Sequence, residues 1–127
     1  MYKKLILLAV VALVLVGCGS SSGPDASEGE KLFNSATIGS DAGCITCHSV
    51  DPDKVIVGPS LAGIATDAAG DAADEGITTE AMLKIMITEP NAEVVEGFPA
   101  DTMPQDFATQ MSSQQLDDVI AYLMTLK

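Results

Sequence analysis

CITCH, residues 44–48, contains two of the three cysteines and the only histidine of this 127-residue chain. The pattern C-x-x-C-H is typical of covalent attachment of a c-type haem. Each thiol adds to one of the two vinyl groups of the haem and forms a thioether, and the adjacent imidazole becomes a ligand of the iron. The motif therefore predicts one haem c, bound covalently through Cys44 and Cys47, with His48 as its proximal ligand.

Other sites that use cysteine and histidine fit this chain less well. A blue-copper site takes two histidines, and the chain has one. A thioredoxin-like pair needs a βαβ context, which residues 35–60 do not show. A structural zinc site needs four protein ligands, one more than Cys44, Cys47 and His48 supply. A disulfide between the two cysteines stays open in an oxidising compartment, although it leaves His48 without a role.

The N-terminus has the features of an export signal. Lys3 and Lys4 precede an apolar stretch of 12 residues, 5–16. A transmembrane helix needs about 20 apolar residues, so residues 1–17 are predicted to be a signal peptide. The stretch Leu15-Val16-Gly17-Cys18 resembles a bacterial lipobox, which implies cleavage before Cys18 and a diacylglyceryl group on its sulfur. A standard signal peptide with an incidental cysteine and an uncleaved anchor are the alternatives.

The organisation that follows is a tether and one domain. Residues 18–26 comprise the lipidated cysteine and a serine- and glycine-rich stretch, which is a flexible linker by composition. Residues 27–127 are long enough for one domain. The two acyl chains of the diacylglyceryl group on Cys18 are enough to anchor a protein stably. The membrane lipid is therefore a predicted partner, through Cys18. The predicted location is extracytoplasmic, in the periplasm or on the outer face of the cytoplasmic membrane.

The charge of the chain restricts its partners. Without residues 1–17, four basic residues remain against 18 carboxylates. Phosphates would be repelled by such a surface, which excludes nucleic acid as a partner. The charge favours redox partner proteins with a basic docking surface, and ordinary solubility is the alternative explanation.

A capping box predicts the start of a first helix. Ser27 is the expected N-cap, with Glu30 at the third helical position, and the helix runs through Phe33. Gly29 lies on the same face as Phe33. Glycine inside a helix is costly, which predicts that another element approaches Gly29 closely.

A second capping box, Ser112 with Gln115, predicts the start of a last helix. Its apolar face follows the helical spacing at Leu116, Val119, Ile120 and Leu123, with Tyr122 beside it. A middle helix is expected from Thr78 or Thr79 to just before Pro90. A short helical turn is expected at 60–65. Residues 66–76 are interpreted as a solvated acidic loop that binds no metal, because they lack the spacing of a calcium loop.

Five short elements follow one another along about 100 residues of the chain: Gly29-x-x-x-Phe33, CITCH, Gly58-Pro59-Ser60-Leu61, Met103-Pro104 and Tyr122-Leu123. With these elements in this order, the chain resembles the class I cytochromes c. The resemblance implies an all-α, cytochrome c-like fold of three to five short helices around one haem, with the first and last helices crossing. It also implies that the carbonyl of Pro59 accepts a hydrogen bond from the second ring nitrogen of His48, which orients the ligating imidazole.

Six methionines are candidates for the sixth position on the iron. Methionines at apolar helix positions are core residues by default, and these are Met82, Met86 and Met124. Met1 leaves with the signal peptide. Met103 lies in a loop and precedes Pro104, as the axial methionine of the family does, so Met103 is the predicted ligand, with Met111 as the runner-up.

Two protein ligands leave the iron no open position for a substrate, which predicts a carrier of single electrons and not an enzyme. A thioether ligand raises the potential. The stretch Glu89 to Lys127 is similar to the cytochrome domains of oxidase subunit II and to the small lipoprotein cytochrome of alternative complex III. This implies transfer between respiratory or photosynthetic complexes, as a carrier or as a fixed haem subunit of a quinol-oxidising or terminal oxidase complex. The alternatives are a haem peroxidase or gas sensor with an open sixth site, and a structural lipoprotein with a disulfide.

Overall fold

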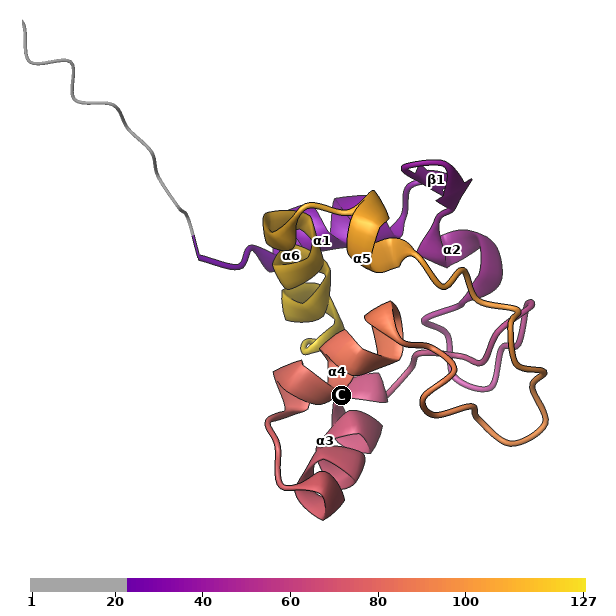
Figure 1. The fold of residues 1–127 in the computed structure, drawn as a ribbon, viewed down its shortest axis with the longest axis vertical. Coiled ribbons are helices and arrows are strands. Elements are labelled where there is room, and N and C mark those ends of the chain that lie inside the picture. The colour runs from indigo at the N-terminus through magenta and orange to yellow at the C-terminus, as the bar shows by residue number, and fades with distance from the viewer. Residues whose placement is uncertain (1–22) are drawn as a thin grey trace, which may run out of the picture.

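The computed structural model describes residues 23–127, so the predicted signal peptide and the lipid-bearing Cys18 lie outside the described residues. Within that range the chain is mainly helical (Figure 1). The elements in chain order are α1 (Ala26–Phe33), β1 (Thr37–Ile38), β2 (Asp41–Ala42), α2 (Cys44–Cys47), α3 (Ile64–Glu75), α4 (Thr79–Thr88), α5 (Phe107–Gln110) and α6 (Ser113–Leu123).

The fold class agrees with the prediction, and two details differ from it. The described residues form six helical segments and not three to five, because α2 and α5 are single turns of four residues each. The antiparallel hairpin of β1 and β2 was not predicted, and its strands have two residues each. No helix within residues 23–127 is long and apolar enough to cross a membrane.

Helices α1 and α6 cross and pack against each other (Figure 1). At the crossing Gly29 lies directly on the backbone of α6, where a Cβ at position 29 would overlap the carbonyl group of Asp118. The expected close approach to Gly29 is therefore confirmed. The rings of Phe33 and Tyr122 lie beside the crossing with centroids 5.3 Å apart, a separation at which aromatic pairs attract each other.

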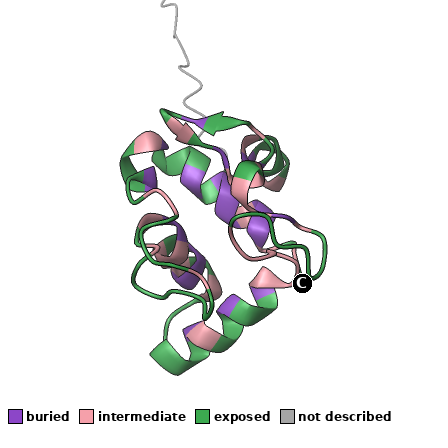
Figure 2. Cartoon of the chain, turned by 90° about the vertical axis from the view of Figure 1, so that its right-hand side faces the viewer, coloured by how far each residue is buried: buried purple, intermediate pink, exposed green. Residues whose placement is uncertain are grey.

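The core forms between the helices, and Figure 2 shows buried positions mainly on helices and exposed positions mainly in the loops. Phe33, Leu83 and Val119 are the largest side chains that are fully buried. The predicted apolar face of α6 is confirmed, since all four of its residues are buried: Leu116, Val119, Ile120 and Leu123. Burial of one such side chain contributes about 1.5–3 kcal/mol, so this face attaches α6 firmly to the core.

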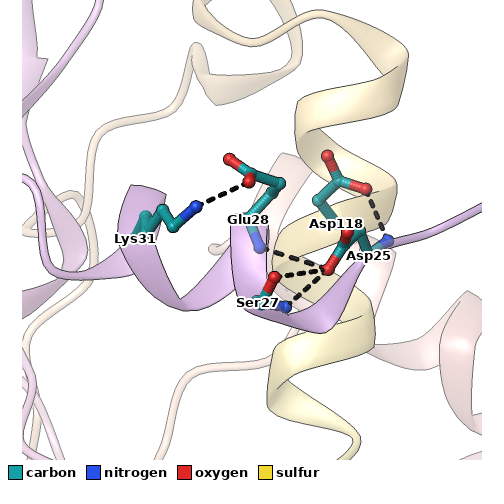
Figure 3. A network of polar contacts seen from close by, with 5 residues as sticks. All are labelled: Asp25, Ser27, Glu28, Lys31 and Asp118. Carbon is teal, nitrogen blue, oxygen red and sulfur yellow. Dashed lines mark hydrogen bonds and ion pairs between the residues drawn. The ribbon is translucent and has the colours of Figure 1, made fainter.

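The N-cap of α1 is Asp25, and the prediction of Ser27 is wrong. The Asp25 carboxylate accepts hydrogen bonds from the hydroxyl and the backbone N–H of Ser27, both at 2.8 Å, and from the N–H of Glu28 at 3.4 Å (Figure 3). These bonds lower the pKa of Asp25. The backbone N–H of Asp25 donates to Oδ1 of Asp118 at 2.7 Å. A carboxylate is a stronger acceptor than a hydroxyl, which favours Asp25 over Ser27 as the N-cap. The bond to Asp118 of α6 holds Asp25 at the start of the helix.

Residues 66–76 are not the loop that their acidic composition predicted, because α3 runs from Ile64 to Glu75. Ala65, Ala68 and Ala72 are buried on one side of this helix, and α3 packs against α4. Alanine has the highest helix propensity, and its small side chain lets two helices lie close together. The acidic residues of α3 occupy its exposed positions and the half-buried Asp71.

The predicted start and end of α4 and the predicted start of α6 are confirmed. The hydroxyl of Thr78 accepts from the N–H of Ala81 at 3.2 Å, and α4 ends at Thr88, before Pro90. The capping box of α6 has both of its bonds, one from the N–H of Gln115 to the Ser112 hydroxyl and one from the N–H of Ser112 to the Gln115 side chain.

Candidate functional site

The CITCH motif forms the single helical turn α2. Residues three apart on a helix share a face, so the turn places the side chains of Cys44 and Cys47 on the same side. Gly43 precedes the turn, and its N–H donates to the carbonyl of Ala36 at 2.9 Å. A side chain at position 43 would overlap the carbonyl of Ser35. The approach of residues 35 and 36 therefore holds the start of the motif in place.

The two thiols of the motif are free and half-buried, so the alternative of a disulfide between Cys44 and Cys47 is not what the structure shows. Burial raises the pKa of the Cys44 thiol to about 11. A thioredoxin-like nucleophile needs a lowered pKa, and Cys44 has the opposite. Side chains of His, Cys, Asp and Glu within residues 23–127 form no group of three or more that could hold a metal ion.

The imidazole of His48 is held by a backbone carbonyl. Nδ1 of His48 lies 2.8 Å from the carbonyl oxygen of Pro59, which is the contact that the resemblance implied. A carbonyl only accepts, so Nδ1 carries the proton and donates. The other ring nitrogen, Nε2, then has its lone pair available for a metal.

The segment after the motif folds back to make this contact. The N–H groups of Val57 and Gly58 both donate to the carbonyl of Cys47, at 3.1 and 2.9 Å. A Cβ at position 58 would lie 2.5 Å from Cε1 of His48, so only glycine lets the backbone pass beside the ring. This role of Gly58 was not predicted, although its position directly before Pro59 was the available signal.

The methionines occupy two kinds of position. Met82 and Met111 belong to the core, with exposed fractions of 3 % and 7 %. Met103 is half-buried, packs against the core and lies in the loop between α4 and α5. Figure 1 shows this loop on the same side of the molecule as the segment that follows α2. The loop that contains the predicted ligand therefore lies on the side of the molecule where the chain leaves the haem-attachment motif.

These residues suit a covalently bound haem. The motif supplies two free thiols on one side of a turn and an imidazole with one nitrogen available. Half-buried apolar side chains within and after the motif pack against the core, among them Ile45, Val50 and Leu61. An apolar surround and an oriented imidazole are the two features that a haem site requires of its protein.

Comparison with known proteins agrees with the geometry of the motif. The cytochrome c family model matches residues 26–127. A cytochrome c2 of Rhodopseudomonas palustris is 33 % identical over an alignment of 150 positions that covers the whole of both chains. A second cytochrome c2 from Rhodopseudomonas palustris is 33 % identical over 124 positions, with 81 % of this chain and 99 % of that protein covered. The chain is thus a member of the cytochrome c family, an electron carrier that binds haem c through Cys44 and Cys47.

Proposed function

We propose that this cytochrome is a lipid-anchored carrier of single electrons in which His48 and Met103 ligate the haem iron. The hydrogen bond from Nδ1 of His48 to the carbonyl of Pro59, 2.8 Å long, is the observation that carries the proposal. It selects the tautomer and the ring orientation in which Nε2 binds a metal. The haem, when bound, supplies reversible one-electron oxidation and reduction at its iron.

Met103 is proposed as the second ligand because of where the methionines lie. Met111 is buried in the core and ends the short helix α5, so moving its sulfur to a metal would open a cavity. Met103 lies in a loop and is half-buried, which keeps its sulfur close to the core without committing it to the packing. A thioether ligand stabilises ferrous iron and raises the potential.

Carbon monoxide binding tests the two-ligand proposal. With both axial positions held by the protein, the ferrous form is expected to bind carbon monoxide slowly at neutral pH, because Met103 must first leave the iron. A reduced-minus-oxidised difference spectrum establishes that haem c is present, and rapid mixing measures the binding rate. Fast binding at neutral pH would overturn the proposal in favour of a gas sensor or peroxidase with an open sixth site.

The anchor is proposed from Cys18 and is tested by its removal. We expect Cys18→Ser to abolish the incorporation of labelled fatty acid into the holoprotein, because the proposed acyl chains are attached to the sulfur of Cys18. The haem spectrum should not change, since Cys18 lies outside the described haem site. Growth with a labelled fatty acid, followed by purification and a spectrum of the labelled protein, checks both expectations. Equal labelling of the variant and the unaltered protein, or no labelling of either, would contradict the lipid anchor.

The partner is proposed to be a redox complex with a basic docking surface. Of the basic residues, Lys31 and Lys54 already pair with neighbouring carboxylates, Glu28 at 2.6 Å and Asp51 at 3.0 Å. Little positive charge is left to offset the 18 carboxylates. Attraction between opposite charges weakens with salt, so an electron-transfer rate that did not fall with ionic strength would contradict this inference.

A further inference from the structure

We propose that Asn91 and Asp101 form a clamp that positions Met103 for the iron. Nδ2 of Asn91 donates to Oδ1 of Asp101 at 2.6 Å, and the backbone N–H of Asp101 donates to Oδ1 of Asn91 at 3.0 Å. The two residues are ten apart in the chain, and Asp101 lies two residues before Met103. The proposal rests on Met103 being the ligand and adds the residues that hold it there.

The segment needs such a clamp because little else determines its shape. It lies between the end of α4 and the start of α5 and has no regular secondary structure. Its backbone hydrogen bonds within residues 91–101 span three residues at most, as from Phe98 to Val95. Val94 and Val95 are 40 % and 54 % exposed, so burial does not anchor the loop. Within residues 91–101, the described hydrogen bonds that join the two ends are those of Asn91 and Asp101.

The backbone conformation of Asp101 also depends on the bonds to Asn91. Its φ is 59°, in the left-handed region that residues other than glycine seldom adopt and that aspartate and asparagine tolerate best. Asp101 lies in a turn, two residues before Met103. The bonds to Asn91 offset the conformational cost, because they form only when the backbone N–H of Asp101 points back across the loop.

Met103 is also held from its other side. Nε2 of Gln105 donates to the carbonyl of Met103 at 2.7 Å, and Pro104 between them has a restricted φ. The clamp and this contact therefore enclose a short segment, 101–105. When the clamp opens, the N-terminal end of that segment is released into a loop of many conformations. Met103 then spends more time away from its ligating position.

A reciprocal exchange of the two side chains tests the clamp in the holoprotein. Asn91→Asp removes the donor and places a second carboxylate against Asp101. Asp101→Asn keeps an acceptor oxygen and the tolerance for a left-handed φ, so it is the matched control for lost charge. The double variant, Asn91→Asp with Asp101→Asn, restores the pair with donor and acceptor exchanged. Asn91→Ala removes both bonds without adding charge.

The readouts are the rate of carbon monoxide binding to the ferrous form and the methionine-to-iron charge-transfer absorption of the ferric form. We expect Asn91→Asp and Asn91→Ala to bind carbon monoxide on the order of tenfold faster and to weaken the absorption. Asn91→Ala loses both hydrogen bonds, and Asn91→Asp replaces the bond to the Asp101 carboxylate with a repulsion between two carboxylates. Asp101→Asn and the double variant should match the unaltered protein. A wild-type rate in Asn91→Asp, or a double variant that does not recover, would overturn the clamp.

Two further measurements separate this proposal from the choice of ligand. If Met103→Leu speeds carbon monoxide binding and Asn91→Asp does not, the clamp is wrong and the ligand is right. If Met103→Leu leaves the rate unchanged, the ligand proposal fails and the positioning role fails with it. Hydrogen exchange at the Asp101 amide does not depend on the ligand, and unchanged protection in Asn91→Ala would show that the bonds themselves do not hold the loop.

Discussion

Replacing Met103 with leucine is expected to open the sixth position of the iron. Carbon monoxide should then bind the ferrous form on the order of a hundredfold faster or more. In the unaltered protein the thioether is off the iron less than about 1 % of the time, and the binding rate is reduced in proportion to that fraction. The potential should fall on the order of 100 mV with the loss of the thioether. Leucine has nearly the volume of methionine, so the change in packing should lower the free energy of unfolding by less than about 1.5 kcal/mol.

Met111→Leu is the matched control for this variant. Met111 was the runner-up in the sequence, and its side chain is 7 % exposed in the core. The same substitution there should leave the carbon monoxide rate and the potential unchanged, with only a small loss of stability. Rapid mixing and a potentiometric titration of both variants decide the matter. A fast rate in Met111→Leu with a normal rate in Met103→Leu would transfer the ligand to Met111.

Gly29→Ala is expected to destabilise the domain by about 3 kcal/mol or more. The added methyl group would overlap the carbonyl of Asp118 and approach the backbone N of Val119. These are backbone atoms of α6 and cannot rotate away as a side chain would. The helices must separate, which also strains the 2.7 Å bond from the N–H of Asp25 to Asp118. Urea unfolding of the holoprotein, followed by circular dichroism, measures the change.

Gly70→Ala provides the comparison for Gly29→Ala. Gly70 lies inside α3, where an added Cβ would meet no atom within 4 Å. Alanine in a helix is more stable than glycine by about 0.5–1 kcal/mol, so this variant should be slightly more stable than the unaltered protein. Equal losses in the two variants would show that the crossing at Gly29 is not the cause.

The helices that could be predicted are those whose determinants lie close together in the chain. Ser112 and Gln115 are three residues apart and cap each other in α6. Thr78 caps α4 in the same local way. In α3 the helix propensity of the alanines is a local determinant, but the burial of Ala68 and Ala72 depends on α4, which packs against them. A stretch of alanine, glycine and aspartate without that cover has the composition of a loop.

The parts of the site divide in the same way. The two cysteines and His48 lie within five successive positions, so the motif alone predicts the covalent attachment of haem. The contact between Pro59 and His48 was expected only through the resemblance to a family, and the structure contains it. The bonds between Asn91 and Asp101 had no sign in the sequence, because a loop of ten residues can close in many ways.

The sequence by itself determined the covalent chemistry of this protein and its most regular helices, since each depends on residues within about one helical turn of each other. It also indicated the family, through short elements that follow one another in order along about 100 residues. The tertiary structure alone decided that the N–H of Asp25 meets Asp118, that α4 covers the buried alanines of α3, that Met111 is buried, and that Asn91 meets Asp101. All of these depend on atoms that are distant in the chain. The free energy of each such contact is gained only when packing brings its atoms together, and a short window of sequence does not show which distant residues will meet.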